Sequence, residues 1–476
     1  MESEIRRLTR RSFISAGLFA GAGAILAACG ATPAPAATAT SAPAATSAPA
    51  ATSAPAEAAT NTPVAEATAA ATPAAAGGQK VVIKVFECCW DGEHIDAGKK
   101  LYAAWAEQHP NIDPQVYWPP DWENNFLTAM ASGEQYDVIF WCMSPWKFMD
   151  EGKMLDLNPL IEADTSFDQN DFYADMRDIW LDKQGHRYGW PTNYATTLMY
   201  WNTKMFADAG VNPPTDEYTW DDLLQMAQKL TKDTGDPATM KFGYLFRPVD
   251  LEHMVQSFGG NFVDPDAKRC DFEKPESVQG LQFFSDLIYK YKVSPQQAQM
   301  AGQDEVAMFA SQRVAMVSLP EWGLDEFLKA HKESGLEFDV LLMPKGPAKR
   351  TTRLRPSASS IFASTKNPKE AWEVQKFMLS PEYEKRLMVE IPESPPARIS
   401  VNQYKVDQLT YPKNKADFME SPKYGIFPYY DKRYGKEMQD TINPILDLLF
   451  TGKEKDMKAL AAKACQDINA KFAEIG

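Results

Sequence analysis

The chain has 476 residues, and 44% of them are hydrophobic, which is enough for one large core or two of medium size. Its 64 acidic residues outnumber its 49 lysines and arginines, and the net charge of −15 repels nucleic-acid phosphates and anionic lipid headgroups. The composition therefore argues against a nucleic-acid-binding protein and against a protein held to a membrane by a basic patch.

The first 29 residues predict an export signal rather than part of the fold. Arg10 and Arg11 precede a weakly apolar stretch, Phe13 to Ala28, which is too short for a comfortable membrane span. The Arg pair resembles a twin-arginine (Tat) signal, with a Sec signal that contains two arginines as the alternative. LAAC then resembles a lipobox, which predicts a lipidated Cys29; an ordinary signal with an incidental Cys is the other interpretation.

Residues 30–79 predict a disordered tether. They consist mainly of Ala, Thr, Ser and Pro with repeats of ATSAPA, and Glu57 and Glu66 are their only charges. Such a segment buries too little apolar surface to offset the entropy of ordering, and its prolines keep it extended. A tether after a lipidated Cys predicts a soluble domain displayed on the outer face of the cytoplasmic membrane, at the cell surface or in the periplasm.

After the tether, the pattern is that of an α/β domain. VVIKVF at residues 81–86 predicts a buried strand, and the helix that follows ends at Pro110. A second helix begins after Asp121, and DVIFW at residues 137–141 predicts another buried strand. This alternation predicts a mostly parallel sheet with helices on both faces.

Helix boundaries are equally clear in the rest of the chain. Thr219 and Asp222 form a capping-box variant, while Pro275 and Pro368 begin helices. The strand-like runs TLMYWN, KFGYLF and RVAMVSL alternate with these helices, and a last helix follows Met457. Roughly 400 residues of this kind exceed one ordinary domain, so two lobes are expected.

Seven motifs follow one another in a specific order, namely DVIFW, GKMLDLNPLI, HRYGWPTNYATTLMYWNTKMFADAG, PPTDEYTWDDLLQMAQKLT, SFGGN, FASQRVAMVSLPEWG and IPESPPARISV. Each is weak alone, but their ordered series resembles the extracellular solute-binding proteins of family 1, the maltose-binding-like group. The resemblance covers nearly all of residues 80–476. Gln312, Glu321 and Trp201 depart from the family pattern, which affects ligand detail more than the fold.

The resemblance implies a two-lobed α/β fold of the periplasmic-binding-protein type II, with a hinge and a ligand cleft between the lobes. It places crossings between the lobes near Trp190–Asn193 and Phe338–Pro344. The first lobe then comprises residues 80–190 and 341–385, and the second comprises residues 191–340 and the C-terminal helices in 386–476.

Sugars present flat C–H patches and a ring of hydroxyls, so their sites need aromatic faces and fixed polar groups, which open α/β sheets hold at strand ends. Four such places are Trp90 with Asp91, Trp141, Asn193 with Tyr194, and Trp322. In relatives, the positions that match Trp141 and Trp322 commonly contact sugar. Further candidates are Glu321, Arg247, Glu252, Phe258, Ser357 and Arg398.

Each candidate also has a structural interpretation. Trp90 and Trp141 are suited to a core, Asn193 and Tyr194 to hinge hydrogen bonds, and Arg398 to a loop anchor. The run KRTTRLR at residues 349–355 predicts a solvated loop. If the run instead lies at the cleft, it favours an acidic sugar.

The cysteines suggest a disulfide rather than a metal site. Cys88 and Cys142 end strands that we expect to be neighbours, so in an exported chain they either form a disulfide or remain buried thiols. A metal site at Cys89, Asp91 and His94 has little support, because the chain contains neither CxxC nor HExxH spacing. We expect no metal and no cofactor.

The resemblance implies the substrate-binding subunit of an ABC importer, a monomer that binds a carbohydrate by lobe closure and delivers it to a membrane permease. The alternatives are a binding protein for another solute, such as a phosphorylated polyol, a polyamine or a metal chelate, an adhesion lipoprotein, and a secreted glycan-cleaving enzyme. The enzyme requires two carboxylates that face one bond, and no catalytic motif is present.

Overall fold

The computed structural model describes residues 80–88, 90–141, 146–236, 239–264, 266–391, 394–428 and 435–475. The predicted export signal with Arg10 and Arg11, the lipobox Cys29 and the tether lie outside the described residues, as do Cys89 and Cys142. Within these ranges, no helix combines the length and the apolar character that a bilayer crossing requires.

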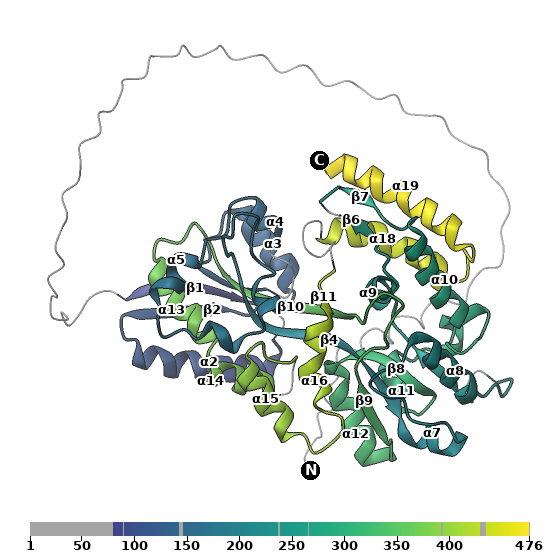
Figure 1. Cartoon of the computed structure of the whole chain (residues 1–476). Coiled ribbons are helices and arrows are strands. Elements are labelled where there is room, and N and C mark those ends of the chain that lie inside the picture. The colour runs from purple at the N-terminus through teal and green to yellow at the C-terminus, as the bar shows by residue number, and fades with distance from the viewer. Residues whose placement is uncertain are drawn as a thin grey trace, which may run out of the picture. The chain divides into compact units, whose positions relative to one another are not determined.

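Nine of the described strands build one large sheet that continues from one lobe into the other, and β6 and β7 form a separate hairpin (Figure 1). The strand order is β2-β1-β3-β10-β4-β8-β5, with β9 paired to β4 and β11 paired to β10. The strands are β1 (Val81–Glu87), β2 (Ile112–Tyr117), β3 (Val138–Trp141), β4 (Trp190–Asn202), β5 (Phe242–Leu245), β8 (Val314–Pro320), β9 (Phe338–Leu341), β10 (Thr352–Ile361) and β11 (Gly425–Ile426).

The sheet is mixed, which corrects the expectation of a mostly parallel sheet. β1 pairs in parallel with β2 and β3, and β5 pairs in parallel with β8. β4 and β10, however, run antiparallel to each other, and β4 is also antiparallel to β8 and β9, as β10 is to β3. These two strands cross between the lobes in opposite directions, so they cannot belong to simple βαβ units, which would make them parallel.

Both crossings lie at the centre of the sheet. The first half of β4 pairs with β10 and its second half pairs with β8 and β9. The crossing predicted near Trp190–Asn193 corresponds to the start of β4. The predicted second crossing near Phe338–Pro344 is wrong, because β9 in that segment pairs with the far end of β4, deep in the second lobe. The chain returns instead through β10, which pairs with both β4 and β3.

Each lobe has its own core on each face of the sheet. In the N-terminal lobe, one cluster includes Val85, Phe140 and Trp372, and the other includes Phe86 and Trp141. The side chains of β3 alternate between these two clusters, as the period of a strand requires. The C-terminal lobe has two clusters of its own on the other half of the sheet. Separate cores make two bodies that a hinge can move relative to each other.

The helices of the N-terminal lobe begin and end largely where the sequence predicts. Gly133 adopts a left-handed conformation with φ 80° and ends the helix that follows Asp121, as glycine does at many helix ends. The elements are α2 (Gly92–Gln108), α3 (Trp122–Ser132), α4 (Trp146–Asp150), α5 (Asn158–Ala163), η1 (Gln169–Asp171), α6 (Ala174–Arg177), α13 (Pro368–Met378), α14 (Pro381–Glu384) and the π-helical segment η5 (Lys385–Glu390).

In the C-terminal lobe, Thr219 and Asp222 form the predicted capping box, in which each side chain accepts a hydrogen bond from the backbone N–H of the other residue. The elements there are α7 (Thr203–Ala209), α8 (Trp220–Leu230), η2 (Pro248–Asp250), α9 (Leu251–Ser257), β6 (Val263–Asp264), β7 (Arg269–Cys270), α10 (Pro275–Tyr289), η3 (Gln297–Met300), α11 (Glu305–Ala310), η4 (Glu321–Gly323), α12 (Leu324–Ser334), α18 (Gly435–Phe450) and α19 (Met457–Ile475).

A third connection runs beside the two crossing strands. It contains α15 (Ile399–Gln408), α16 (Asp417–Glu420) and η6 (Ser421–Tyr424) and ends in β11, which pairs with β10. Its start is fastened to β4 by backbone hydrogen bonds from Ala397 to Thr192 and from Tyr194 to Pro395, both 3.0 Å long. Three segments thus connect the lobes at one place.

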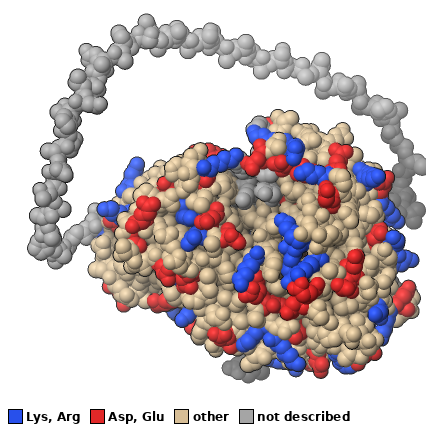
Figure 2. Space-filling model, viewed as in Figure 1, with Lys and Arg blue, Asp and Glu red and all other residues tan. Residues whose placement is uncertain are grey.

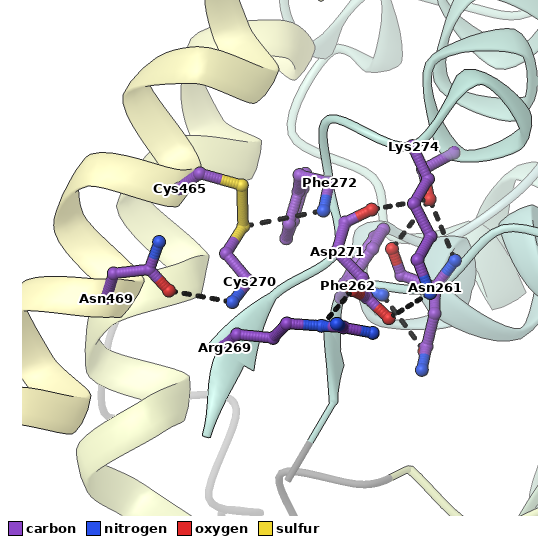
Figure 3. The surroundings of a disulfide bond; sticks show 10 residues. Asn261, Phe262, Arg269, Cys270, Asp271, Phe272, Lys274, Cys465 and Asn469 are labelled. Atoms are coloured by element: carbon purple, nitrogen blue, oxygen red, sulfur yellow. Dashed lines mark hydrogen bonds and ion pairs between the residues drawn. A yellow bond between two sulfur atoms is a disulfide. The ribbon is translucent and has the colours of Figure 1, made fainter. Parts of the chain in front are cut away.

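A disulfide between Cys270 and Cys465 fastens the last helix to the C-terminal lobe (Figure 3). The two Cα atoms lie 5.0 Å apart although the residues are 195 positions apart in the sequence. Asn469, one turn further along α19, accepts a hydrogen bond of 2.8 Å from the backbone N–H of Cys270. The hairpin of β6 and β7 is therefore joined to α19 both covalently and by a side chain.

Candidate functional site

A cavity of about 300 Å³ lies between the lobes, where the crossing strands meet. Its described lining comes from the strand ends of the N-terminal lobe, from the crossing strands and from two loops of the C-terminal lobe. The lining residues are Trp90, Phe140, Asn193, Tyr194, Ala195, Thr197, Arg247, Pro320, Trp322, Arg353, Arg355, Pro356, Ser357 and Ser394. Six of the predicted ligand contacts are among them, so the fold brings together residues that are distant in the sequence.

The base of the cavity is an irregularity in the crossing strands. The pairing of β10 with β4 shifts between Pro356 and Ala358, so Thr192 and Asn193 of β4 lie opposite Ser357 of β10. A bulge of this kind changes the direction of the side chains beside it. Asn193 Oδ1 is buried and accepts no hydrogen bond within the described structure. An acceptor in this state is available to a ligand hydroxyl.

Tyr194 lines the cavity and also contacts the third connection between the lobes. Its hydroxyl accepts a hydrogen bond of 2.7 Å from Asn402 Nδ2 of α15. Burial, followed by the nearby Glu321, raises the pKa of Tyr194 well above its ordinary value, so the hydroxyl stays protonated. The hinge role and the ligand-contact role that the sequence suggests for Tyr194 are therefore compatible in space.

Two tryptophans present aromatic surface to the cavity. Trp322 lies in η4 directly after β8, and 46% of its surface is exposed. The guanidinium carbon of Arg247 lies 5.5 Å from the centroid of its ring, in cation–π geometry. Trp90 stacks on His94, with ring centroids 5.0 Å apart, and makes a tilted contact with Phe140 at 5.4 Å. These contacts fix both rings before any ligand arrives.

Arg247, one of the charged side chains that line the cavity, belongs to a buried network. Arg247 donates two hydrogen bonds to Asp250, from Nε to Oδ2 at 2.8 Å and from Nη2 to Oδ1 at 2.9 Å. Thr197 Oγ1 donates a third, of 3.1 Å, to the same carboxylate. Burial alone raises the pKa of Asp250, but Arg247, with smaller effects of His253 and Arg353, outweighs it and holds the pKa below its ordinary value. Asp250 is therefore a fixed negative charge that orients Arg247.

Glu321 precedes Trp322 and is almost fully buried. Burial raises the pKa of its carboxyl group to about 8, with only a partial counter-effect from Lys405. The group is therefore mainly protonated near neutral pH. In this state it is a neutral neighbour of the cavity, although the described lining does not include it.

The structure corrects the predicted position of Trp141 at the site. Its side chain is completely buried in the N-terminal core, where its ring contacts Phe126, Phe148 and Phe362, and it does not line the cavity. The alternation of side chains along β3 explains why Trp141 does not reach the cavity, because neighbouring residues of a strand point to opposite faces. Phe140, one position earlier, is the residue of this strand that reaches the cavity.

Four further candidates have contacts elsewhere and do not line the cavity. Phe258 packs against Phe283 and Phe284 of α10, and Glu252 is buried within α9. Asp91 caps α2 by accepting hydrogen bonds from the backbone of Glu93 and His94. Arg398 forms an ion pair of 3.0 Å with Asp171, and its guanidinium carbon lies 4.6 Å from the Phe172 ring centroid. These contacts match the loop-anchor interpretation of Arg398.

Arg353 and Arg355 line the cavity but are not among the predicted site residues. The sequence predicts a solvated loop for the run at 349–355, but the structure places its last residues in β10. Leu354 between the two arginines is buried on the opposite face. The alternation of Arg, Leu and Arg could have indicated a strand here, because it has the period of a strand with one polar face.

Three other hollows are larger than this cavity but less suited to a sugar. The smallest of the three, of about 450 Å³, is lined by residues of the C-terminal half of the sheet and its surroundings, among them Trp201 and His331. One of about 1090 Å³ lies entirely within the C-terminal lobe, next to Trp220 and Phe283, so lobe closure does not act on it. Another, of about 480 Å³, is lined by Gly259, Lys349 and other mostly polar residues, and Phe427 is the aromatic residue in its described lining. The cavity at the crossing strands combines both lobes with two tryptophans, so we take it as the candidate site.

The described residues contain no group of His, Cys, Asp and Glu that is arranged to hold a metal ion. Cys88 is disulfide-bonded, while Cys142, its predicted partner, lies outside the described residues. The pairing of these two cysteines therefore stays a prediction.

Residues 91–385 match the family described as bacterial extracellular solute-binding protein. The chain belongs to this family. The match includes both crossing strands and most of the residues that line the cavity.

Curated relatives extend the match at low identity. The chain is 25% identical over 307 residues to the maltotriose-binding protein of Pyrococcus abyssi, which covers 61% of this chain and 62% of the relative. It is 26% identical over 249 residues to the arabinooligosaccharide-binding protein of Bacillus subtilis, which covers 50% of this chain and 55% of the relative. The chain thus spans between about half and two thirds of the length of these relatives.

Solved structures agree in fold. An ABC substrate-binding protein from Listeria monocytogenes in complex with cycloalternan matches with a TM-score of 0.69 at 21% identity, over 83% of this chain and 100% of that one. The sugar-binding protein MalE from Xanthomonas citri matches with a TM-score of 0.70 at 16% identity, over 83% and 98% of the two chains. The predicted two-lobed α/β fold is confirmed.

Proposed function

We propose that this protein is the substrate-binding component of an ABC importer and that it captures a carbohydrate in the cavity between its lobes. The observation that carries the proposal is the joint presence of Trp322, Trp90 and Asn193 around one cavity at the crossing strands. Aromatic faces suit the C–H patches of a sugar ring, and a buried acceptor suits its hydroxyls. Relatives named for binding maltotriose and arabinooligosaccharides support the same ligand class.

Lobe closure is the proposed mechanism. A ligand that contacts Trp90 on one lobe and Trp322 on the other binds the closed state more tightly, so it shifts the population towards that state. The two crossing strands and the third connection supply the hinge, since the four core clusters belong to one lobe or the other. The permease would then recognise the closed form and accept the sugar from it.

The proposal includes the location and the state of the protein. The family is extracellular, and the twin-arginine signal and the lipobox at Cys29 suit export followed by attachment to the outer face of the cytoplasmic membrane. The Ala/Thr/Ser/Pro tether would hold the two-lobed domain at a distance from the lipid. The protein would act as a monomer and without a cofactor.

Catalysis is not part of the proposal. Hydrolysis of a glycosidic bond needs two carboxyl groups placed on either side of that bond. The lining of the cavity, as far as the structure describes it, contains arginines but neither Asp nor Glu. This composition supports binding and delivery rather than cleavage.

The test is a thermal-shift screen of the purified protein against mono- and oligosaccharides, followed by calorimetric titration of each sugar that raises the melting temperature. Tight binding of a sugar with one-to-one stoichiometry, and recovery of that sugar intact by mass spectrometry, is the expected result. Failure of every sugar in a broad panel would refute the proposal, and release of reducing ends would favour the enzyme instead.

A further inference from the structure

The segment WDGEH at residues 90–94 joins the sugar cavity to the first helix of the N-terminal lobe. Trp90 lines the cavity, whereas Asp91 and His94 are absent from its described lining. These two residues nevertheless contact each other, and His94 contacts the tryptophan. They can therefore act on the cavity through Trp90 without touching a ligand themselves.

Binding of an uncharged sugar depends on contacts inside the cavity rather than on charges at the surface. The chain has a net charge of −15, and Figure 2 shows acidic and basic side chains interspersed over one face. Such charges do not steer a neutral molecule. Aromatic faces then supply much of the affinity, and a ring that is already held in place supplies more, because ordering a mobile side chain on binding costs free energy.

Asp91 begins α2 and also anchors the ring of His94. Its Oδ1 accepts hydrogen bonds from the backbone N–H groups of Glu93 and His94, at 3.1 and 3.2 Å. The same oxygen lies 2.8 Å from Nδ1 of the His94 ring. This contact is the main cause of a lowered pKa of Asp91, so the carboxyl group is ionised near neutral pH. Because an ionised carboxylate only accepts hydrogen bonds, Nδ1 is the donor.

The anchored imidazole stacks on the indole of Trp90. The two ring centroids lie 5.0 Å apart and the ring planes differ by 20°. A stacked neighbour covers one face of the indole, while the contact of Trp90 with Phe140 is tilted by 49°. His94 is itself only 5% exposed, so the surrounding protein restricts its movement. The start of α2 thus determines the plane of the tryptophan ring.

The second nitrogen of His94 takes no part in the hydrogen bonding of the described residues. Nε2 is buried and has no partner among them. A buried acceptor without a partner lowers stability, so another property of this side chain must offset that cost. The flat ring, fixed at Nδ1 and stacked on Trp90, is the property that the geometry supplies.

We infer that Asp91 and His94 are positioning residues of the sugar site, which hold the ring of Trp90 ready for a ligand that neither of them touches. This inference rests on the proposed function and adds two residues to it. It also gives Asp91, which does not line the cavity, an indirect role in binding.

A double-mutant cycle tests the inference by calorimetric titration of the full chain. The probe is the sugar that raises the melting temperature most in a panel that begins with maltotriose and arabinotriose. His94→Ala should weaken binding about two- to tenfold, since the Trp90 ring must then be ordered by the ligand. In a Trp90→Ala background, the same substitution should change the affinity less than about twofold, because the ring that His94 holds is gone.

Two further variants separate the ring from its hydrogen bond. His94→Phe keeps a flat ring and gives up only the bond to Asp91, so it should restore most of the affinity that His94→Ala loses. His94→Asn keeps a donor but has no ring, so it should bind as weakly as His94→Ala. Asp91→Ser keeps an oxygen that can cap α2 but is too short to anchor the imidazole, and should lose part of the affinity.

His109→Ala is the matched control. His109 ends the same helix and stacks on Trp105, with ring centroids 3.9 Å apart and planes 14° apart, but neither residue lines the cavity. The substitution removes an imidazole from an indole at a distance from the ligand. It should leave the sugar affinity unchanged, even if the melting temperature falls as it does in His94→Ala.

The outcomes distinguish the inference from the proposed function. Unchanged affinity in His94→Ala, an equal loss in the Trp90→Ala background, or failure of His94→Phe to restore binding would each overturn the inference and leave the sugar site in place. If His94→Ala does not fold, His94→Asn against His94→Phe gives the same comparison. Absence of binding by every sugar to the unaltered protein would refute the proposed function, and the inference with it.

Discussion

Trp322→Ala is the substitution that probes the proposed sugar site most simply. The ring lies at the end of β8, faces the cavity and has 46% of its surface exposed, so it has little part in holding the C-terminal core together. Its main protein contact on this side is the cation–π contact with Arg247. The substitution should therefore weaken ligand binding and leave the fold intact.

The magnitude follows from the area that a sugar ring would cover. A tryptophan side chain has about 150–250 Å² to bury, and 46% of the residue surface is still exposed here. Covering that part removes about 70–115 Å² from water, which contributes about 2–3 kcal/mol at about 25 cal/mol/Å². The dissociation constant for the preferred sugar should thus increase about 20- to 100-fold.

Calorimetric titration and thermal unfolding together check this result. Tyr404→Ala is the matched control, because Tyr404 is also an exposed aromatic residue, at 41%, with the ammonium group of Lys385 4.8 Å from its ring centroid, but it lies on α15 away from the cavity. It should leave the affinity unchanged. If Trp322→Ala binds the sugar as tightly as the unaltered protein, the assignment of this ring to the ligand is refuted.

Three predictions concern stability. Replacing Cys270 and Cys465 by Ser frees a hairpin and a helix that are 195 residues apart, and should lower the free energy of unfolding by about 2–5 kcal/mol in urea titrations; an unchanged midpoint would contradict a structural role. Because burial raises the folded-state pKa of Glu321 to about 8, above its ordinary value of 4.5, the folded protein retains a proton that the unfolded chain releases, and stability falls as the pH rises between these values. Glu321→Gln has no such proton to release. The free energy of unfolding of the variant, relative to that of the unaltered protein, should therefore increase by up to about 1.4 kcal/mol per pH unit from pH 5 to 8. A difference between the two free energies that stays constant across that range would refute the raised pKa. Arg398→Ala leaves the carboxylate of Asp171 in a largely buried place without its ion pair, and should cost about 3 kcal/mol or more in thermal unfolding while sugar affinity in the folded fraction is kept; a large loss of affinity alone would assign Arg398 to the ligand.

Local signals predicted several of the elements. The capping box at Thr219 and the prolines that begin α10 and α13 act within one or two turns of the chain, so the residues that decide them are visible together. The mixed character of the sheet was not visible in this way. It depends on β4 and β10 crossing between the lobes in opposite directions, which no short window records.

The residues of the site likewise divide into those that local signals could predict and those that depend on distant parts of the chain. The position of Trp90, Asn193 and Trp322 around one cavity could be predicted because strand ends gather at one edge of a sheet whatever the details of packing. Trp141 was wrong by one position, since the register of β3 decides that Phe140 faces the cavity. The register is set by pairing with β1 and β10, which lie about 50 and 220 positions away in the sequence.

Long-range contacts also decided two features outside the prediction. The disulfide of Cys270 depends on α19 packing against the hairpin of β6 and β7. Arg353 and Arg355 line the cavity because β10 is a crossing strand rather than a solvated loop. In both cases the residue types were visible, but their neighbours come from distant parts of the chain.

A crystal structure of the protein with the sugar that raises its melting temperature most is the most direct test of the carbohydrate site. We expect electron density for one ligand at the crossing strands, in contact with Trp322, Asn193 and at least one of the cavity arginines, and touching both lobes. Density confined to the groove beside Trp220 and Phe283 within the C-terminal lobe would contradict it.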